Sequence, residues 1–335
     1  MTSVVVITGG TAGVGRATTC RFAQAGASVA VLARGRDGLD GALADIERLG
    51  GRGLAIETDV ADAAQVERAA DQIERELGPI DVWINNAMTT TVGPVHSITP
   101  EEFQRVTAVT YLGFVWGTQA ALARMRPRNR GTIIQVGSAL AYRSIPLQAP
   151  YCAAKHAIAG FTDSLRSELL HDRVAIDVCM VQLPAVNTPQ FGWCRNKTGH
   201  AVEPVPPIFQ PEIIANALYE VAHHPRREVF LGASAIKAIV GNKLAPGYAD
   251  HYLAKYGYSG QLLPEPEGDR PDNLFAPVSG DPGAHGTFDA RARSHDLVAR
   301  IATKLGAAGT QLAIAAGASV AAAALVLGAR ALYRR

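Results

Sequence analysis

A short β-branched run, followed at once by a glycine-rich turn and a helix, constrains the fold of this chain more than any other feature. Val4–Thr8 reads as a strand, residues 9–15 contain four glycines, and residues 16–24 read as a helix. This order places backbone N–H groups and the positive end of a helix dipole against a phosphate. Glycine is needed wherever a side chain would keep the backbone from a pyrophosphate. The stretch therefore predicts a nucleotide-binding turn, the alternative being a plain strand-to-helix turn without a ligand.

Strand-like and helix-like segments then alternate as far as about residue 232. A capping box, Thr99-Pro100-Glu101-Glu102, opens the longest predicted helix, which reaches about Met125. Such alternation is typical of a parallel sheet covered by helices on both faces, so the predicted fold class is α/β with a doubly wound parallel sheet. The other predicted strands are 28–33, 54–57, 81–85, 132–137, 175–181 and 228–231, and the other predicted helices are 39–49, 62–77 and 211–222.

A tyrosine and a lysine four residues apart form the main candidate for catalysis. On a helix Tyr151 and Lys155 share one face, so the ammonium can lie near the phenol oxygen. A nearby positive charge lowers a tyrosine pKa from about 10 towards neutrality and makes the residue a candidate acid/base. Taken alone, the pair is a weak signal, and most such pairs are simply helix surface. Ser138 closes the apolar run 132–137, which places its hydroxyl at the carboxyl end of a strand, where open α/β sheets bind ligands.

The residues after the second predicted strand bear on the choice of cofactor. Sheets that bind NAD usually carry an acidic residue there for the ribose 2′-hydroxyl, whereas an arginine suits the 2′-phosphate of NADP. Ala33 supplies no carboxylate, and Arg34 supplies a guanidinium. The sequence therefore favours NADP(H), with NAD(H) as the alternative. Arg36 reads as an ordinary solvated loop charge.

Charge and cysteine content argue against several classes of partner. The 335 residues include 32 Lys and Arg against 30 Asp and Glu, and a net charge of +2 gives no reason to expect nucleic acid. The four cysteines show no metal-type spacing and are too few to staple a chain of this length. We therefore predict no metal site and a reducing, cytoplasmic setting. A strand that begins at about Ser3 leaves no room for a signal peptide.

Over about residues 1–232 the chain resembles the short-chain dehydrogenase/reductase family in the order and spacing of its motifs. The matching motifs are the TGxxxGxG turn at residues 8–15, Asp59-Val60, Asn85-Asn86-Ala87, Ser138, Tyr151 with Lys155, and residues 184–188. The resemblance implies a single Rossmann-like catalytic domain that often assembles into homo-oligomers. It also implies an oxidoreductase that moves a hydride between a nicotinamide and a secondary alcohol or ketone.

The resemblance assigns roles to individual residues. Tyr151 would be the acid/base, Ser138 would hold the substrate oxygen, and Lys155 would lower the tyrosine pKa and bind the nicotinamide ribose. Thr188 would contact the carboxamide, and Asp59 the adenine. With Arg34 added, the candidate cofactor-binding residues are Gly9, Thr11, Gly13, Val14, Gly15, Arg34, Asp59, Val60, Asn86, Ala87, Tyr151, Lys155 and Thr188.

Three positions depart from the pattern of the family. Met88 and Ala185 stand where the family has glycines, at places where backbone freedom or a close cofactor approach is usual. Thr110 falls where the family commonly has an asparagine in a proton relay, and a hydroxyl cannot copy both ends of an amide. These departures leave open a second hypothesis, a nucleotide-binding regulatory or scaffold protein on a retired enzyme fold.

The composition changes after residue 232. Residues 233–256 could form one or two helices, and residues 257–286, rich in proline and glycine, read as an extended wrapping segment or a linker. We therefore divide the chain into a catalytic domain, 1–232, and an extension, 233–306.

The uncharged stretch 307–329 is 23 residues long. As a helix it would reach about 34 Å, enough to cross a hydrocarbon core of about 30 Å. We predict that it anchors the chain to a membrane with the catalytic domain in the cytoplasm, which would suit a lipophilic substrate. The alternative is an alanine-rich helix buried between subunits.

Overall fold

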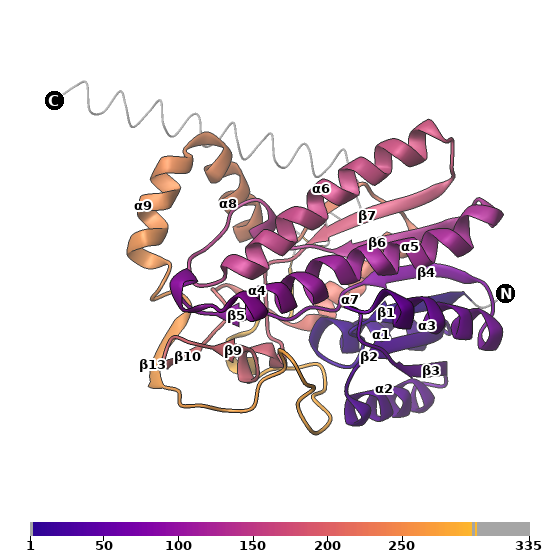
Figure 1. The fold of residues 1–335 in the computed structure, drawn as a ribbon, viewed down its shortest axis with the longest axis horizontal. Coiled ribbons are helices and arrows are strands. Elements are labelled where there is room, and N and C mark those ends of the chain that lie inside the picture. The colour runs from indigo at the N-terminus through magenta and orange to yellow at the C-terminus, as the bar shows by residue number, and fades with distance from the viewer. Residues whose placement is uncertain (1–2, 297–298, 300–335) are drawn as a thin grey trace.

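The computed structural model describes residues 3–296 and residue 299. Its centre is a seven-stranded sheet in the order β12-β7-β6-β4-β1-β2-β3, and every neighbouring pair in it is parallel (Figure 1). Because the order reverses between β1 and β4, ligands are expected beyond the carboxyl ends of the strands at that point. The strands are β1 (Val4–Thr8), β2 (Ser28–Ala33), β3 (Arg52–Glu57), β4 (Ile80–Asn85), β6 (Gly131–Val136), β7 (Ile176–Gln182) and β12 (Glu228–Phe230).

Helices cover both faces of the sheet, which confirms the predicted α/β fold class. One face packs against α1 (Gly13–Gln24), α2 (Arg36–Arg48) and α7 (Pro211–His223). The other packs against α3 (Ala63–Glu76), α5 (Gly113–Met125) and α6 (Ala149–His171), with α4 (Pro100–Thr107) beside α6.

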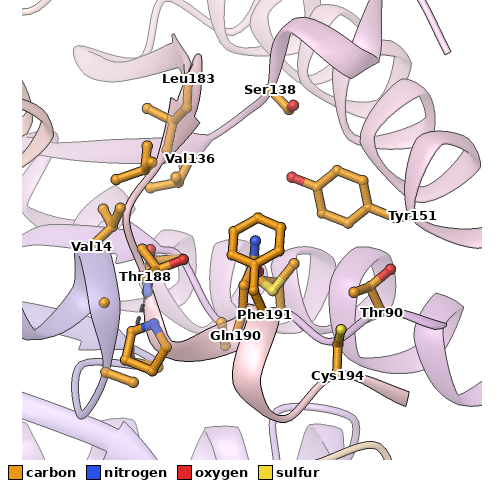
Figure 2. A pocket seen from close by; sticks show the side chains of 18 of the residues that line it. Val14, Thr90, Val136, Ser138, Tyr151, Leu183, Thr188, Gln190, Phe191 and Cys194 are labelled. Atoms are coloured by element: carbon orange, nitrogen blue, oxygen red, sulfur yellow. Dashed lines mark hydrogen bonds between the residues drawn. The ribbon is translucent and has the colours of Figure 1, made fainter. Parts of the chain in front are cut away.

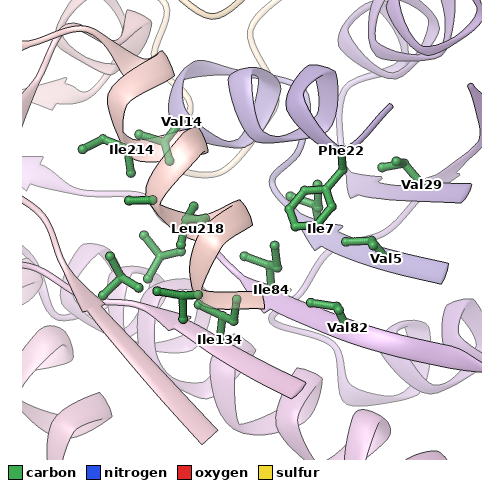
Figure 3. Close-up of a cluster of buried hydrophobic side chains, with 14 of the residues drawn as sticks. Val5, Ile7, Val14, Phe22, Val29, Val82, Ile84, Ile134, Ile214 and Leu218 are labelled. Atoms are coloured by element: carbon green, nitrogen blue, oxygen red, sulfur yellow. The ribbon is translucent and has the colours of Figure 1, made fainter. Parts of the chain in front are cut away.

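The apolar core on the first face explains how the glycine turn is held in place. Phe22 of α1 is 1% exposed and lies over Val5, Ile7 and Val29 of the two strands that flank the turn (Figure 3). Full burial of a side chain of this size contributes roughly 1.5 to 3 kcal/mol. The helix that follows the turn is therefore fixed to the sheet by packing.

The predicted caps are confirmed, but α2 begins three residues before its predicted start at 39, and two other helices also differ from the prediction. Asp62 caps α3, and Thr99 with Glu102 forms the predicted capping box of α4. α1 begins at Gly13, inside the glycine motif, because the turn itself supplies the first helical residues. The long helix is interrupted by a π-helical turn, Ala108–Leu112, between α4 and α5.

The chain beyond the main sheet builds one end of the molecule. Helices α8 (Ala233–Leu244) and α9 (Pro246–Tyr256) stand together at the end opposite the N-terminus (Figure 1). Three small two-stranded sheets pair β5 (Thr91–Val92) with β9 (Arg195–Asn196), β8 (Ala185–Val186) with β11 (Ile208–Phe209), and β10 (His200–Val202) with β13 (Leu262–Pro266). The rest of 257–296 is mostly extended and contacts the catalytic domain along its path.

One helix among the described residues, Pro100–Arg128, is long and apolar enough to cross a membrane. Half of its most apolar window is buried inside the protein, and it packs against the sheet through α5, so it is a core helix. The predicted membrane anchor, 307–329, lies outside the described residues.

Candidate active site

A single cavity of about 500 Å³ runs along the carboxyl edge of the main sheet. It is lined by residues at or just beyond the ends of six strands: Gly9, Arg34, Thr58, Asn86, Gly137 and Leu183. All three predicted catalytic residues line it, as do all predicted cofactor-binding residues except Gly15. The parallel topology therefore gathers side chains that are far apart in the sequence.

The glycines of the turn are required by close contacts. Gly9 has a φ of +64°, and a Cβ there would lie 2.8 Å from the Cα of Ala87. Gly13 has a φ of +54°, and a Cβ there would lie 2.9 Å from Cγ2 of Thr188. Gly15 lies behind the turn, where a Cβ would be 2.0 Å from the carbonyl oxygen of Gly9. The first two keep the cavity wall thin, and the third lets α1 pack against the turn.

Asn86 holds the glycine turn from the neighbouring strand. Its Nδ2 donates to the carbonyl oxygens of Thr8 and Gly9 at 3.0 and 3.1 Å. The Thr8 hydroxyl in turn accepts from the backbone N–H groups of Asn86 and Ala87 at 2.9 and 3.1 Å. Asn86 thus holds the turn in shape. Thr8 makes the reciprocal hydrogen bonds, although it was not among the predicted site residues.

Ser138 is held by a chain of buried and partly buried polar groups. Its backbone N–H donates to Oε1 of Gln182 at 2.7 Å, and Nε2 of Gln182 donates to Oε1 of Glu228 at 2.7 Å. The Tyr142 hydroxyl donates to the same Glu228 oxygen at 2.5 Å. The Ser138 hydroxyl accepts from the N–H of Leu140 at 3.1 Å and points towards Tyr151 (Figure 2). No local pattern could predict this support, because its members lie on β7, on β12 and in the segment after β6.

Tyr151 and Lys155 lie at the inner end of the cavity, on the first turns of α6. The hydroxyls of Ser138 and Tyr151 face one another there (Figure 2). Lys155 is 2% exposed, and its Nζ donates to the carbonyl oxygen of Val136 at 2.7 Å. The same Nζ lies 4.7 Å from the ring centroid of Phe114. The two hydroxyls therefore face one another, and the amine lies 5.6 Å from the centre of the Tyr151 ring.

The predicted effect of Lys155 on its neighbour is not what this arrangement produces. Burial raises the pKa of Tyr151 to about 12, and its interaction with Ser138 opposes that rise only in part. Burial also lowers the pKa of Lys155 to about 7, since no carboxylate among the described residues pairs with the amine to offset desolvation. The pKa of the tyrosine thus moves in the opposite direction to the expectation, because desolvation outweighs the lowering by the hydrogen bond with Ser138.

The buried amine predicts a pH effect on stability. Between the folded pKa of about 7 and the ordinary value of 10.5, the unfolded chain binds more protons at Lys155, so the free energy of unfolding rises with pH. Replacing it, in Lys155→Met, removes this contribution. From pH 7 to pH 10.5, we expect the unfolding free energy of the wild type to increase relative to that of the variant. Urea unfolding across this range measures it, and a difference independent of pH would contradict the buried, weakly basic amine.

The opposite end of the cavity is built around Arg34 and Asp59. Oδ2 of Asp59 pairs with Nη2 of Arg105 at 2.7 Å, and its Oδ1 accepts from the N–H of Ala61 at 3.0 Å. Arg34 donates through Nη1 to the carbonyl oxygen of Phe275 at 3.0 Å. Burial and the nearby Arg105 lower the pKa of Arg34, which stays charged. Arg105, which the sequence did not single out, is thus part of this end of the site.

The three departures from the family pattern fall in different places. Met88 and Ala185 line the cavity. Thr110 is fully buried in the π-helical turn, where its hydroxyl donates to the carbonyl oxygen of Thr89 at 2.8 Å and accepts from the N–H of Thr89 at 3.0 Å. Its hydroxyl ties the loop after β4 to the helix.

The residues present fit a nicotinamide dinucleotide. The strand order places the guanidinium of Arg34 beyond β2, the glycines Gly9 and Gly13 beyond β1, and the Ser138 hydroxyl beyond β6, and all of them line the cavity. A pyrophosphate suits backbone N–H groups at a helix start, and a ribose suits a buried amine. Among residues 3–296, no group of three or more His, Cys, Asp or Glu side chains is placed to hold a metal ion.

Comparison with known proteins places the chain in a family. The sequence model of the short chain dehydrogenases matches residues 3–197, more than half of the chain. The chain is 29% identical to the uncharacterized oxidoreductase YxnA of Bacillus subtilis (strain 168) over 279 residues, 81% of this chain and 77% of that protein. It is 33% identical to 17-beta-hydroxysteroid dehydrogenase 13 of Homo sapiens over 166 residues, 50% of this chain and 55% of that protein.

A solved structure has the same fold. An alcohol dehydrogenase from the archaeon Thermococcus sibiricus, complexed with 5-hydroxy-NADP, superposes with a TM-score of 0.60 at 23% identity, covering 69% of this chain and 96% of that one. Together with the parallel sheet and the cavity at its carboxyl edge, these matches show that the chain belongs to the short-chain dehydrogenase family of oxidoreductases, which act on CH–OH and C=O groups.

Proposed function

We propose that the protein is an NADP(H)-dependent oxidoreductase that interconverts a secondary alcohol and a ketone, with Tyr151 as the acid/base. The observation that carries this proposal is the facing pair of hydroxyls, Ser138 and Tyr151 (Figure 2). Buried Lys155 lies beside the tyrosine, and Arg34 lines the same cavity. Two hydroxyls directed at one point can both donate to a single carbonyl oxygen.

Each residue has a separate task in this proposal. Ser138, fixed by Gln182, holds the substrate oxygen, and Tyr151 gives or takes its proton. The pKa of about 12 makes Tyr151 a proton donor in ketone reduction. Lys155, positioned by its bond to the Val136 carbonyl, binds ribose hydroxyls and assists the tyrosine when charged. The nicotinamide, when bound, supplies or accepts the hydride.

The substrate end of the cavity favours an apolar ketone or alcohol. Beyond the hydroxyl pair the lining is largely aliphatic and aromatic, and includes Val92, Leu140, Ile145, Phe191, Trp193 and Val205. Such walls bury apolar surface of a ligand and leave the two hydroxyls to orient its one polar group. The test is to measure the turnover of a panel of apolar ketones through the consumption of NADPH. No turnover of any member would favour the scaffold hypothesis that the motif departures suggested.

For the cofactor we propose NADP(H) over NAD(H), because β2 ends in Ala33 and Arg34 without a carboxylate. A new carboxylate at position 33 should repel a 2′-phosphate. We expect Ala33→Asp to weaken NADPH binding by about ten-fold or more and to change NADH binding much less. Ala33→Asn, which has the same shape without the charge, is the control. Equal loss for both cofactors in Ala33→Asp would contradict a 2′-phosphate site here.

We further propose that the catalytic domain, 1–232, is cytoplasmic, forms a homo-oligomer, and is held at a membrane by the uncharged stretch 307–329. A lipid-soluble substrate and the apolar pocket would suit this location. We expect the full-length protein to pellet with membranes and to be released by detergent but not by high salt. A version that ends at Lys304 should stay in the supernatant. If both versions are soluble without detergent, the stretch is better explained as a helix buried between subunits.

A further inference from the structure

The C-terminal extension crosses back over the nucleotide end of the cavity. We call residues 272–283 the strap; it lies in the orange-to-yellow part of the chain in Figure 1. Five of its residues line the cavity, all more than 200 positions beyond Arg34 in the sequence: Asn273, Pro277, Val278, Gly280 and Pro282. The strap therefore belongs to the wall of the site, although it lies outside the region matched by the family.

Two guanidinium groups hold the first part of the strap. Arg34 donates to the carbonyl oxygens of Asn273 and Phe275, the latter at 3.0 Å. Nε of Arg105 donates to the carbonyl oxygen of Leu274 at 3.0 Å. Leu274 is itself fully buried. Three successive carbonyls are thus bound by the residues that form the Arg34–Asp59 end of the cavity.

An ion pair holds the second part. Asp281 accepts from Nη1 and Nη2 of Arg16 at 2.9 and 3.2 Å, and Arg16 is only 4% exposed. Close by, the N–H of Gly280 donates to Asp37 at 2.7 Å. Such a two-pronged arginine–carboxylate contact is strong and geometrically specific.

The strap also accepts a hydrogen bond from a backbone N–H group that could bind a phosphate. The N–H of Gly13, the first residue of α1, donates to the carbonyl oxygen of Gly283 at 3.0 Å. Phosphates bind such N–H groups, and they bind arginine forks more strongly than a neutral carbonyl does. A dinucleotide can therefore displace the carbonyls of Gly283 and Phe275 from Gly13 and Arg34. The Arg16–Asp281 pair lies outside this exchange, since neither residue lines the cavity.

We propose that the strap is a movable part of the cofactor site, closing over the nucleotide end of a bound dinucleotide, and that the Arg16–Asp281 pair controls how fast the cofactor is exchanged. The inference rests on the proposed function, because it takes the cavity to be the dinucleotide site. Cofactor then enters and leaves only while the strap is lifted, and lifting breaks the ion pair together with the hydrogen bonds to Arg105 and Asp37.

The first test is the variant Asp281→Asn. Arg16 keeps its 2.8 Å bond to Asp45, so the fold should survive. We expect the dissociation rate of NADPH, monitored by its fluorescence in stopped flow, to rise about three- to ten-fold, because the variant loses the charge of the carboxylate that faces buried Arg16, although Asp281 itself is 42% exposed. Association should also become faster. Asp269→Asn, an exposed aspartate just before the strap, is the matched control and should leave both rates unchanged.

A disulfide that locks the strap is the second test. A Cβ built on Gly35 lies 3.2 Å from Cβ of Pro277, close to the roughly 3.5 to 4.5 Å that a disulfide needs. In Gly35→Cys/Pro277→Cys, oxidation should slow NADPH exchange at least ten-fold, and reduction should restore it. Unchanged rates in both Asp281→Asn and the oxidised double variant would overturn the proposal, and so would failure of the disulfide to form.

Binding and strap motion can be tested apart from each other. If neither NADPH nor NADH binds the wild type, the proposed function fails. If a cofactor binds but its exchange rates are the same in wild type, in Asp281→Asn and in the oxidised double variant, the strap proposal alone fails. Hydrogen exchange without cofactor gives a further readout: the N–H of Gly280 should exchange about ten-fold faster in Asp281→Asn than in wild type or Asp269→Asn. Equal exchange in all three proteins would show that the ion pair does not hold the strap.

Discussion

Tyr151→Phe is expected to lower kcat by about 10² to 10⁴-fold, the range that a positioned general acid or base contributes. Phenylalanine keeps the ring and removes only the oxygen that faces Ser138 (Figure 2). Cofactor contacts elsewhere in the cavity are left intact, so the dissociation constant of NADPH should change by no more than about three-fold. A loss confined to kcat would mean that the Tyr151 oxygen carries the proton exchanged with the substrate.

Steady-state kinetics and NADPH fluorescence titration measure the two effects separately. Tyr219→Phe is the control: Tyr219 lies on α7, packed against Phe22 and away from the cavity, and should retain full activity. Should Tyr151→Phe keep more than about a tenth of the activity, another group would have to carry the proton.

Gly15→Ala is expected to weaken NADPH binding by about two orders of magnitude and to destabilise the fold by about 1 to 3 kcal/mol. The added methyl would lie 2.0 Å from the carbonyl oxygen of Gly9 and 2.7 Å from Nδ2 of Asn86. Neither can turn away freely, since the first is backbone and the second is bound to Thr8 and Gly9. The glycine turn would therefore have to move, and it forms the wall of the cavity.

Gly160→Ala provides the contrast. Gly160 lies within α6, and a Cβ there meets nothing within 4 Å. Alanine at an unobstructed helix position should leave binding unchanged and raise stability by up to about 1 kcal/mol. Chemical denaturation and NADPH titration on both variants make the comparison. Wild-type affinity in Gly15→Ala would mean that the turn accommodates the methyl without moving the phosphate-binding wall.

The sequence alone determined the parts of this protein that depend on local order. A strand, a glycine turn and a helix can be recognised from adjacent residues, and alternating strands and helices imply a parallel sheet. A parallel sheet brings the carboxyl ends of its strands to one edge, so Ser138, Asn86 and Arg34 could be predicted to share a site. The spacing of Tyr151 and Lys155 sets them on one helical face whatever the rest of the chain does.

Only the tertiary structure decided the electrostatics of that site. The sequence predicted that Lys155 lowers the pKa of Tyr151, yet burial raises that pKa to about 12. The spacing of two residues says how near their charges lie, but it does not say how much water reaches them, and desolvation dominates here. In the same way, Gln182 and Glu228 support Ser138 only because β7 and β12 are neighbours in the folded sheet.

The strap was likewise decided by the tertiary structure. From the sequence, Arg34 is a guanidinium at the end of a strand, and nothing nearby shows that its acceptors lie near residue 275. Asp281, 265 positions from Arg16, has no periodic or motif relation to its partner. A contact between such distant residues depends on the path of the whole chain. An irregular segment has no periodic pattern of apolar residues from which its packing partner could be predicted.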